Sequence, residues 1–215
     1  MASVEKFTFS AISNQLRHVE RTIEHNANTD IDPERTCLDY SLLDRGVSSY
    51  SYFRERLSDL YVYKNRELKP LCGWVITLPD DVPADKEGDF FQHCFDFLNK
   101  RYGKENCISA VVHKDESGKP HMHYLFVPVT KRKKVTEKHP EQYKICANEV
   151  LTKRELRDFH PALDKYLRQQ GLPCSVYTGV TARQGGNRTV KEIKAERDVQ
   201  RERQVARERT PILWT

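Results

Sequence analysis

The chain has 215 residues, of which 38% are hydrophobic and 31% charged, a composition typical of one globular domain with a hydrated surface. No segment approaches the roughly 18 consecutive apolar residues of a membrane-spanning helix, and the first residues lack the apolar run of a signal peptide. We therefore expect a cytoplasmic protein without a membrane span, in which the six scattered cysteines are reduced thiols.

The charge is mildly basic, with a formal net charge of +5 at pH 7, which favours nucleic acid over other partners only slightly. Its distribution is more informative. Residues 131–134 read KRKK, and cations outnumber anions in residues 183–209. Either segment is a candidate surface for a polyanion.

Hydrophobic patterning predicts strands and helices that alternate along the first half of the chain. Residues 4–9 and 71–79 have the character of strands, and residues 15–25 and 51–65 that of helices. A polar loop containing Pro33 lies between the two predicted helices.

The second half begins with the clearest helix, residues 89–103, whose apolar face is rich in phenylalanine and which Gly103 is expected to end. Two β-rich runs joined by a turn-forming loop then predict a hairpin. Further elements are expected at 151–171 (a helix broken near Pro161), 175–180 (a strand) and 189–209 (a charged helix). The hairpin requires antiparallel pairing, so the predicted fold is α+β, a central antiparallel sheet with helices packed on it.

Three histidines lie on the predicted hairpin. His121 and His123 are two residues apart, so they lie on one face of their strand, and His113 ends the partner strand. Three imidazoles meeting on one face match a three-ligand metal site with open positions. A structural role for three histidines so placed is the less favoured alternative.

The ligand set does not identify the metal. Neutral imidazoles suit zinc, whereas open positions filled by phosphate oxygens and water suit manganese or magnesium. We expect manganese, with magnesium and zinc as alternatives. Asp115 and Glu116 follow in the turn: Asp115 is a candidate to orient a ligating imidazole, and Glu116 to contact a nucleophile or become a fourth ligand.

A metal site in a chain that also carries KRKK suggests a phosphodiester substrate, since a metal ion stabilises charge that develops at phosphorus. Cationic residues near such a site would bind the phosphates of a nucleic-acid strand. The candidate DNA-binding residues are Lys131, Arg132, Lys133, Lys134, Arg183, Arg188 and Lys191.

These motifs resemble a known family. The run HKDES followed by PHMH, after an AVVH strand, resembles the metal motif of HUH endonucleases, specifically the MobV-class (Mob/Pre) plasmid mobilisation relaxases. Residues 17–42, RHVERTIEHNANTDIDPERTCLDYSL, are similar to the first motif of that family. The resemblance extends over about residues 1–180, which implies an HUH catalytic domain there. From its charge pattern, the remainder, 181–215, is expected to be a basic, charged helical extension that contacts DNA or is a truncated linker to a further region.

The resemblance implies that the chain nicks and rejoins one DNA strand at an origin of transfer, through a covalent histidine–5′-phosphate intermediate. The matching nucleophile is His18, with Arg21 three residues later as a phosphate ligand and Glu116 as the carboxylate that activates His18. Origin-of-transfer DNA is the implied partner, along with a coupling protein or other relaxosome components.

Tyr40, in the LDY that matches an (N/D)-Y pair of the family, is the rival nucleophile or a DNA contact. A replication initiator or transposase that uses tyrosine is therefore one alternative function. A non-catalytic DNA-binding module stabilised by a metal is the other.

Two positions depart from the family pattern. Val19 stands where the family commonly has asparagine, and the DESGKP loop is one residue longer than the usual DESTP, which puts the placement of Glu116 in question. Relaxases of this class usually continue into a long helical region, so we expect the chain to be either the catalytic domain alone or a natural short version of such a relaxase.

Overall fold

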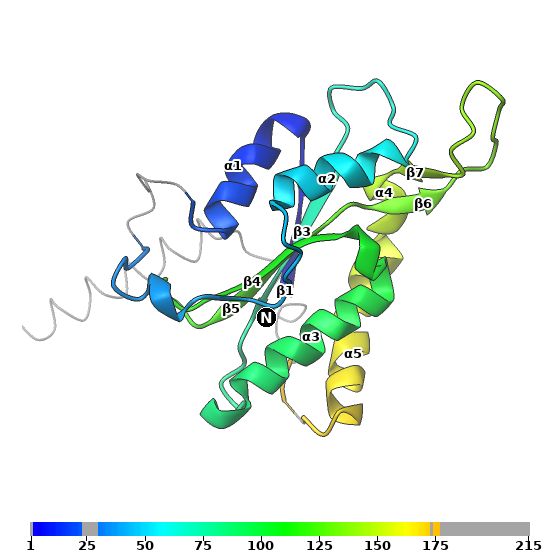
Figure 1. The fold of residues 1–215 in the computed structure, drawn as a ribbon. Helices are drawn as coiled ribbons and strands as arrows, with labels where there is room; N and C mark the ends of the chain where they lie inside the picture. The colour runs from blue at the N-terminus through cyan, green and yellow to red at the C-terminus, as the bar shows by residue number, and fades with distance from the viewer. Residues whose placement is uncertain (1, 23–29, 173, 177–215) are drawn as a thin grey trace, which may run out of the picture. The chain divides into compact units, whose positions relative to one another are not determined.

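Five strands form one sheet at the centre of the computed structural model, which describes residues 2–22, 30–172 and 174–176 (Figure 1). The strand order is β1-β3-β5-β4-β2, and every neighbouring pair is antiparallel. The strands are β1 (Ala2–Phe7), β2 (Tyr40–Ser41), β3 (Leu71–Thr77), β4 (Cys107–His113) and β5 (His121–Phe126). The chain beyond β5 forms a separate ribbon of β6 (Val129–Lys131) and β7 (Tyr143–Ile145).

Helices cover both faces of the sheet, which gives the predicted α+β architecture (Figure 1). The first face carries α1 (Phe9–Val19) and α2 (Ser49–Ser58), and the second carries α3 (Glu87–Tyr102) and α5 (Lys153–Gln169). The remaining helical elements are α4 (Ala147–Val150) and the short 3-10 turns η1 (Thr36–Leu38), η2 (Ala84–Lys86) and η3 (Lys104–Asn106). None of the helices within the described ranges is long and apolar enough to cross a membrane.

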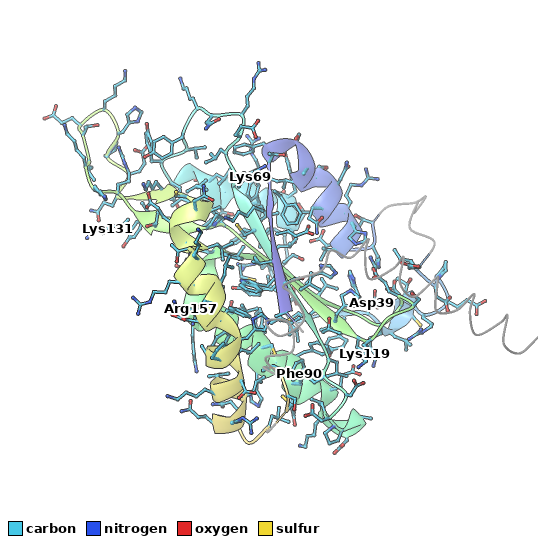
Figure 2. The ribbon with its side chains drawn as sticks, turned by 180° about the vertical axis from the view of Figure 1, so that it is seen from behind. Asp39, Lys69, Phe90, Lys119, Lys131 and Arg157 are labelled. Carbon is cyan, nitrogen blue, oxygen red and sulfur yellow. The ribbon has the colours of Figure 1, made fainter. Side chains whose placement is uncertain are left out.

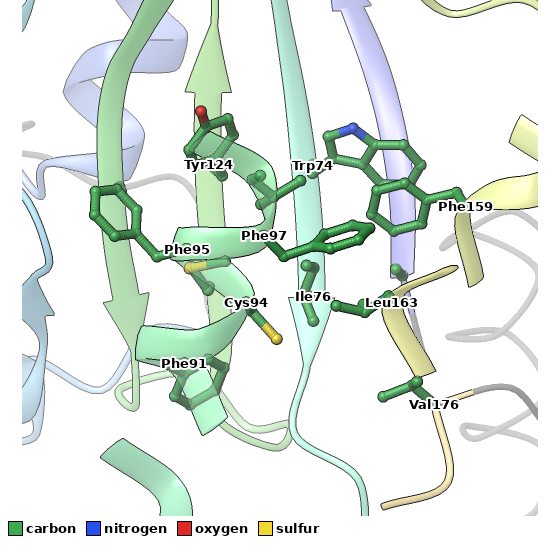
Figure 3. Close-up of a cluster of buried hydrophobic side chains, with 14 of the residues drawn as sticks. Trp74, Ile76, Phe91, Cys94, Phe95, Phe97, Tyr124, Phe159, Leu163 and Val176 are labelled. Atoms are coloured by element: carbon green, nitrogen blue, oxygen red, sulfur yellow. The ribbon is translucent and has the colours of Figure 1, made fainter. Parts of the chain in front are cut away.

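Alternation along the strands divides the apolar side chains between two cores. In β5, Met122 and Tyr124 join the larger core under α3 and α5, whereas Leu125 joins the core under α1 and α2. The larger core contains Trp74 of β3, whose ring stacks on Phe159 of α5 with the ring centroids 3.6 Å apart (Figure 3). The sheet is therefore buried on both sides, and polar residues on it need a specific reason.

Helix α3 follows its prediction closely. It ends at Gly103, whose φ of 87° is a conformation that side-chain-bearing residues rarely adopt. Helix α5 differs from its prediction, because it continues through Pro161 without a break. Phe159 and Leu163, on either side of the proline, are both fully buried, so packing against the sheet holds the two halves in one helix.

Other boundaries also differ from the predictions. Helix α1 ends at Val19, not at residue 25, and the second helix ends at Ser58. Tyr61 exchanges backbone hydrogen bonds with the β7 strand, which draws residues after 58 towards the ribbon. Ser175 and Val176 form no strand, and the remainder of the predicted strand and the charged helix at 189–209 lie outside the described residues.

Candidate active site

Three imidazoles meet at the end of the β4–β5 hairpin. In the register of the hairpin His113 is opposite His121 and Val111 is opposite His123, so all three rings lie on the face covered by α1 and α2. One nitrogen from each ring lies within 4.8 Å of the others, close enough for one metal ion. The predicted convergence of these three residues is present in the structure.

Backbone carbonyls fix which nitrogens face this common space. His113 Nε2 donates to the carbonyl of Val19 at 2.8 Å, and His121 Nδ1 donates to the carbonyl of Lys119 at 3.1 Å. A carbonyl only accepts, so the remaining nitrogen of each ring carries a free lone pair. Among the described residues, His113 Nδ1 and His123 Nε2 are buried and have no hydrogen-bond partner. This donor set fits a divalent metal ion of the kind that imidazole binds.

Burial keeps the rings of His113 and His123 neutral. It lowers the pKa of His113 to about 4 and holds the pKa of His123 well below its usual value. Neutral imidazole is the form that binds metals, so desolvation prepares both rings as ligands.

Glu116 borders the same space. Its carboxylate oxygens lie 4.0 Å from His113 Nδ1 and 3.7 Å from His121 Nε2. The extra residue in the loop therefore leaves this carboxylate next to the cluster.

A fourth imidazole, that of His18, faces the cluster from α1. Its ring centroid is 6.2 Å from that of His113 and 6.1 Å from that of His123, and its plane is perpendicular to both. Ile12, Leu16 and Val19 anchor α1 in the core, and the hydrogen bond from His113 to Val19 joins the helix to the cluster. Burial and, next, the charge of Arg21 lower the pKa of His18, so its ring is neutral at neutral pH.

Arg21 lies beyond the end of α1, in a left-handed conformation with φ of 53°. It was expected to lie within a helix over residues 15–25 and to bind phosphate. Instead its guanidinium donates to Asp115 through two nitrogens at 2.6 and 2.9 Å, to Glu116 at 3.0 Å and to the carbonyl of His18 at 3.0 Å. Its side chain is 7% exposed, so Arg21 ties the end of α1 to the hairpin loop.

Asp115 is fully buried and its carboxylate is bonded to Arg21, while one of its oxygens lies within 4.8 Å of a His113 nitrogen. Burial alone would raise its pKa, but the hydrogen bonds and charge of Arg21 outweigh it and lower that pKa. Thr36 Oγ1 also donates to this carboxylate, at 3.0 Å. The carbonyls of Val19 and Lys119 take over the orienting role expected of Asp115.

Two residues of this network were not singled out from the sequence: Thr36 and Asp39. Asp39 Oδ1 accepts from the backbone N–H of Lys114 at 2.7 Å, and its other oxygen lies 3.5 Å from Arg21 Nε. Asp39 belongs to the LDY motif, in which the family pattern indicated a role for the tyrosine.

Tyr40 lies away from the histidines. Strand β2 pairs it with Val112, and its side chain packs against the larger core, on the opposite face of the sheet from His18. Burial and the nearby charge of Glu87 raise the pKa of Tyr40 to about 12.

Within the described residues, the KRKK segment and the histidine cluster lie at opposite ends. Figure 2 shows Lys131 far from Asp39 and Lys119, which border the histidine end of the hairpin. Lys133 and Lys134 are exposed. Arg183, Arg188 and Lys191, the other predicted DNA-binding residues, lie outside the described residues.

Arg132 differs from its neighbours in this segment. It donates to the carbonyls of His139 and Glu141, both at 2.9 Å, and its guanidinium lies 4.1 Å from the centre of the Tyr61 ring. It therefore holds the β6–β7 loop together and offers little to a ligand.

Comparison with solved structures agrees with the fold. The MobM relaxase domain (MOBV; Mob_Pre), in a manganese-bound crystal structure with plasmid pMV158 oriT DNA, superposes with a TM-score of 0.73. The match covers 91% of this chain and 97% of that one at 24% identity, so it shows a common fold.

Curated relatives are plasmid recombination enzymes. One from Bacillus thuringiensis is 27% identical over 175 residues, which are 79% of this chain and 37% of that protein. A type 3 enzyme from Staphylococcus aureus is 30% identical over 166 residues, or 72% of this chain and 37% of that protein. The chain thus spans little more than a third of the length of these relatives. The family model Mob_Pre, described as plasmid recombination enzyme, matches residues 1–175, and the chain belongs to this family.

Proposed function

We propose that this chain is the catalytic domain of a DNA relaxase, which nicks and rejoins one strand at an origin of transfer through a covalent bond to His18. The observation that carries the proposal is the placement of the His18 ring about 6 Å from two rings of the three-histidine cluster. The MobM domain that shares this fold is bound to oriT DNA, which supports the same substrate class here.

In the proposed reaction, the lone pair of a His18 ring nitrogen forms a bond to phosphorus while the bond from phosphorus to the 3′ oxygen breaks. The 3′ oxygen leaves and takes up a proton, and the ring becomes positively charged. The charges of Glu116 and Asp115 both favour the protonated form of His18, so they stabilise this product. Attack by the same 3′ hydroxyl reverses the step and rejoins the strand.

We infer that His113, His121 and His123 hold a divalent metal ion, with manganese as the first choice because the MobM structure contains it. Bound there, the ion would supply Lewis-acid stabilisation of charge on the phosphoryl oxygens. Glu116 is the nearest carboxylate to this site and Arg21 positions it.

The DNA must extend along the sheet to reach the KRKK segment. Strand β5 runs from His121 to Phe126, roughly 17 Å at 3.4 Å per residue, before the ribbon begins. We propose that Lys131, Lys133 and Lys134 contact the phosphates of duplex or hairpin DNA at least about five base pairs from the cut, since duplex rises about 3.4 Å per pair.

The nucleophile is tested with His18→Phe and Tyr40→Phe. We expect His18→Phe to abolish the covalent protein–DNA adduct on a denaturing gel, because no ring nitrogen remains to attack. Tyr40→Phe removes only a hydroxyl on the opposite face of the sheet and should retain the adduct. An adduct that persists in His18→Phe and disappears in Tyr40→Phe would overturn the assignment in favour of the tyrosine alternative.

The metal site is tested with His121→Ala, because His121 is the most exposed of the three histidines and its loss is least disruptive to folding. We expect manganese affinity, measured by calorimetry, to fall at least tenfold, since one of three ligands is lost. His139→Ala, outside the cluster, is the matched control and should bind manganese as the wild type does.

EDTA should abolish the adduct and leave the circular dichroism spectrum unchanged. Unfolding by EDTA would instead indicate a structural metal.

Arg21→Met tests whether this arginine positions the site. We expect the free energy of unfolding in urea to fall by about 3–5 kcal/mol, because buried Asp115 loses its partner. Arg154→Met, which removes an exposed pair with Asp158, should leave it nearly unchanged, because exposed ion pairs contribute little to stability. Unchanged stability together with weakened DNA binding would mean that Arg21 binds phosphate after all.

The duplex contact is tested by replacing Lys131, Lys133 and Lys134 together with alanine. We expect weaker binding to hairpin DNA and a slope of log affinity against log salt that is shallower by about three units. The control replaces three exposed lysines of the α3–α5 face, Lys100, Lys153 and Lys165, and so removes the same charge elsewhere. Equal changes in slope for the two triple variants would contradict a specific contact at KRKK.

A further inference from the structure

A cavity of about 570 Å³ opens beside the last turn of α1. Pockets for small organic ligands have volumes of a few hundred to about a thousand Å³, so this one has room for a nucleoside. It lies between the end of α1, the segment 36–49 and strand β4. Residues from all three of these parts line the cavity, among them Val19, Arg21, Thr36, Leu43, Arg45 and Val111.

This cavity shares a wall with the proposed catalytic site. Val19 lines the cavity, follows His18 directly and accepts the hydrogen bond from His113. Arg21 also borders both spaces, with its guanidinium bonded to the hairpin loop. A strand whose phosphate lies at His18 therefore passes the mouth of the cavity within a nucleotide or two.

The charge of the lining disfavours a phosphate inside. Three acidic residues, Glu20, Asp39 and Asp44, line the cavity together with two cationic ones, Arg21 and Arg45. Arg21 is already bonded to two other carboxylates. The walls also include the buried apolar residues Val19 and Ile108. A neutral, flat, partly apolar group suits this environment better than an anion does.

Arg45 supplies a donor that nothing in the described chain uses. Its guanidinium lies 3.7 Å from the centre of the Tyr52 ring, and one nitrogen donates to the carbonyl of Cys107 at 2.6 Å. Its Nε is buried without a hydrogen-bond partner among the described residues. Arg45 is therefore a rigidly held, cationic part of the cavity wall.

The segment that walls the cavity also exposes large apolar side chains. Leu38 is 48% exposed, Val47 55% and Tyr50 48%. Val47 lines the cavity, and the other two lie next to lining residues in the chain. Exposed apolar and aromatic groups at a nucleic-acid site are suited to contact the faces of unpaired bases.

We propose that this cavity holds one unpaired base of the DNA strand, adjacent to the phosphate at His18. The proposal rests on the proposed relaxase function and adds a subsite that takes a base, while the sugar–phosphate backbone stays outside. A base seated there would fix the strand relative to the His18 ring.

Val111→Phe tests the proposal, because Val111 lines the cavity and faces the α1 side of the sheet. Val75→Phe is the matched control. Val75 of β3 and Val111 of β4 both pair with His123, one from each neighbouring strand, but Val75 does not line the cavity. The probes are a random pool of 15-nucleotide single strands and a 15-unit abasic chain with the same number of phosphates. Fluorescence anisotropy gives the ratio of the two affinities.

We expect the wild type and Val75→Phe to prefer the base-containing strands about tenfold, and Val111→Phe to lose most of that preference. Full preference in Val111→Phe would overturn the proposal. A second measurement needs no variant: strands carrying 5-iododeoxyuridine are photocrosslinked to the wild type, and the crosslinked peptide should fall within residues 36–49. Crosslinks confined to other parts of the chain would also overturn it.

These outcomes are separate from those for the nicking reaction. Loss of base preference in Val111→Phe without any His18 adduct in the wild type would contradict the relaxase mechanism but support the base subsite. A His18 adduct in the wild type, with the base preference unchanged in Val111→Phe, would support the relaxase mechanism and contradict the base subsite.

Discussion

The arrangement of the site depends on one guanidinium. Arg21 joins the carbonyl of His18 to the carboxylates of Asp115 and Glu116, and so fixes the end of α1 against the β4–β5 loop. Three carboxylates, those of Asp39, Asp115 and Glu116, would repel one another if this cation were absent. Because the side chain is almost fully buried, water cannot replace it, and the ion pairs act in a medium of low dielectric.

The second constraint is the alternation of the sheet. A strand places successive side chains on opposite faces, so His121 and His123 face α1 while Met122 enters the opposite core. The same rule separates the two candidate nucleophiles. Tyr40 pairs with Val112 and faces the core under α3, whereas His18 reaches the cluster from the helix on the other face. The geometry of one hairpin thus bears on which side chain can attack.

Much of this could be predicted from the sequence, for physical reasons that are local. The hairpin, the α3 helix with its stop at Gly103 and the grouping of three histidines all follow from patterns within about fifteen residues. The role of Arg21 could not be predicted, because it depends on where α1 ends and on carboxylates more than ninety residues away. Spacing alone placed Arg21 on the face of a helix that stops two residues before it.

Tertiary packing explains two further differences from expectation. Pro161 weakens a helix locally, but the burial of Phe159 and Leu163 against the sheet stabilises both sides of it. Arg132 belongs to a run of cations, yet it is bonded to two carbonyls and stacked on Tyr61, so charge pattern overstated its availability. Asp39 was overlooked because a carboxylate in a loop carries no periodic signal, and its partner Lys114 is distant in sequence.

The charge of the proposed site links its metal and its DNA. Three carboxylates meet one guanidinium there, and burial keeps His113 and His123 neutral, so these groups by themselves repel a phosphate. A divalent cation held by the three imidazoles would offset the excess and make the same space attractive to a phosphodiester. Binding of the ion and of the strand should then strengthen each other by the same factor, since coupling between two ligands is reciprocal. The contacts proposed between DNA and the lysines of the KRKK segment do not depend on this switch in charge. In this proposal the ion would therefore govern engagement of the scissile phosphate more than attachment of the DNA as a whole.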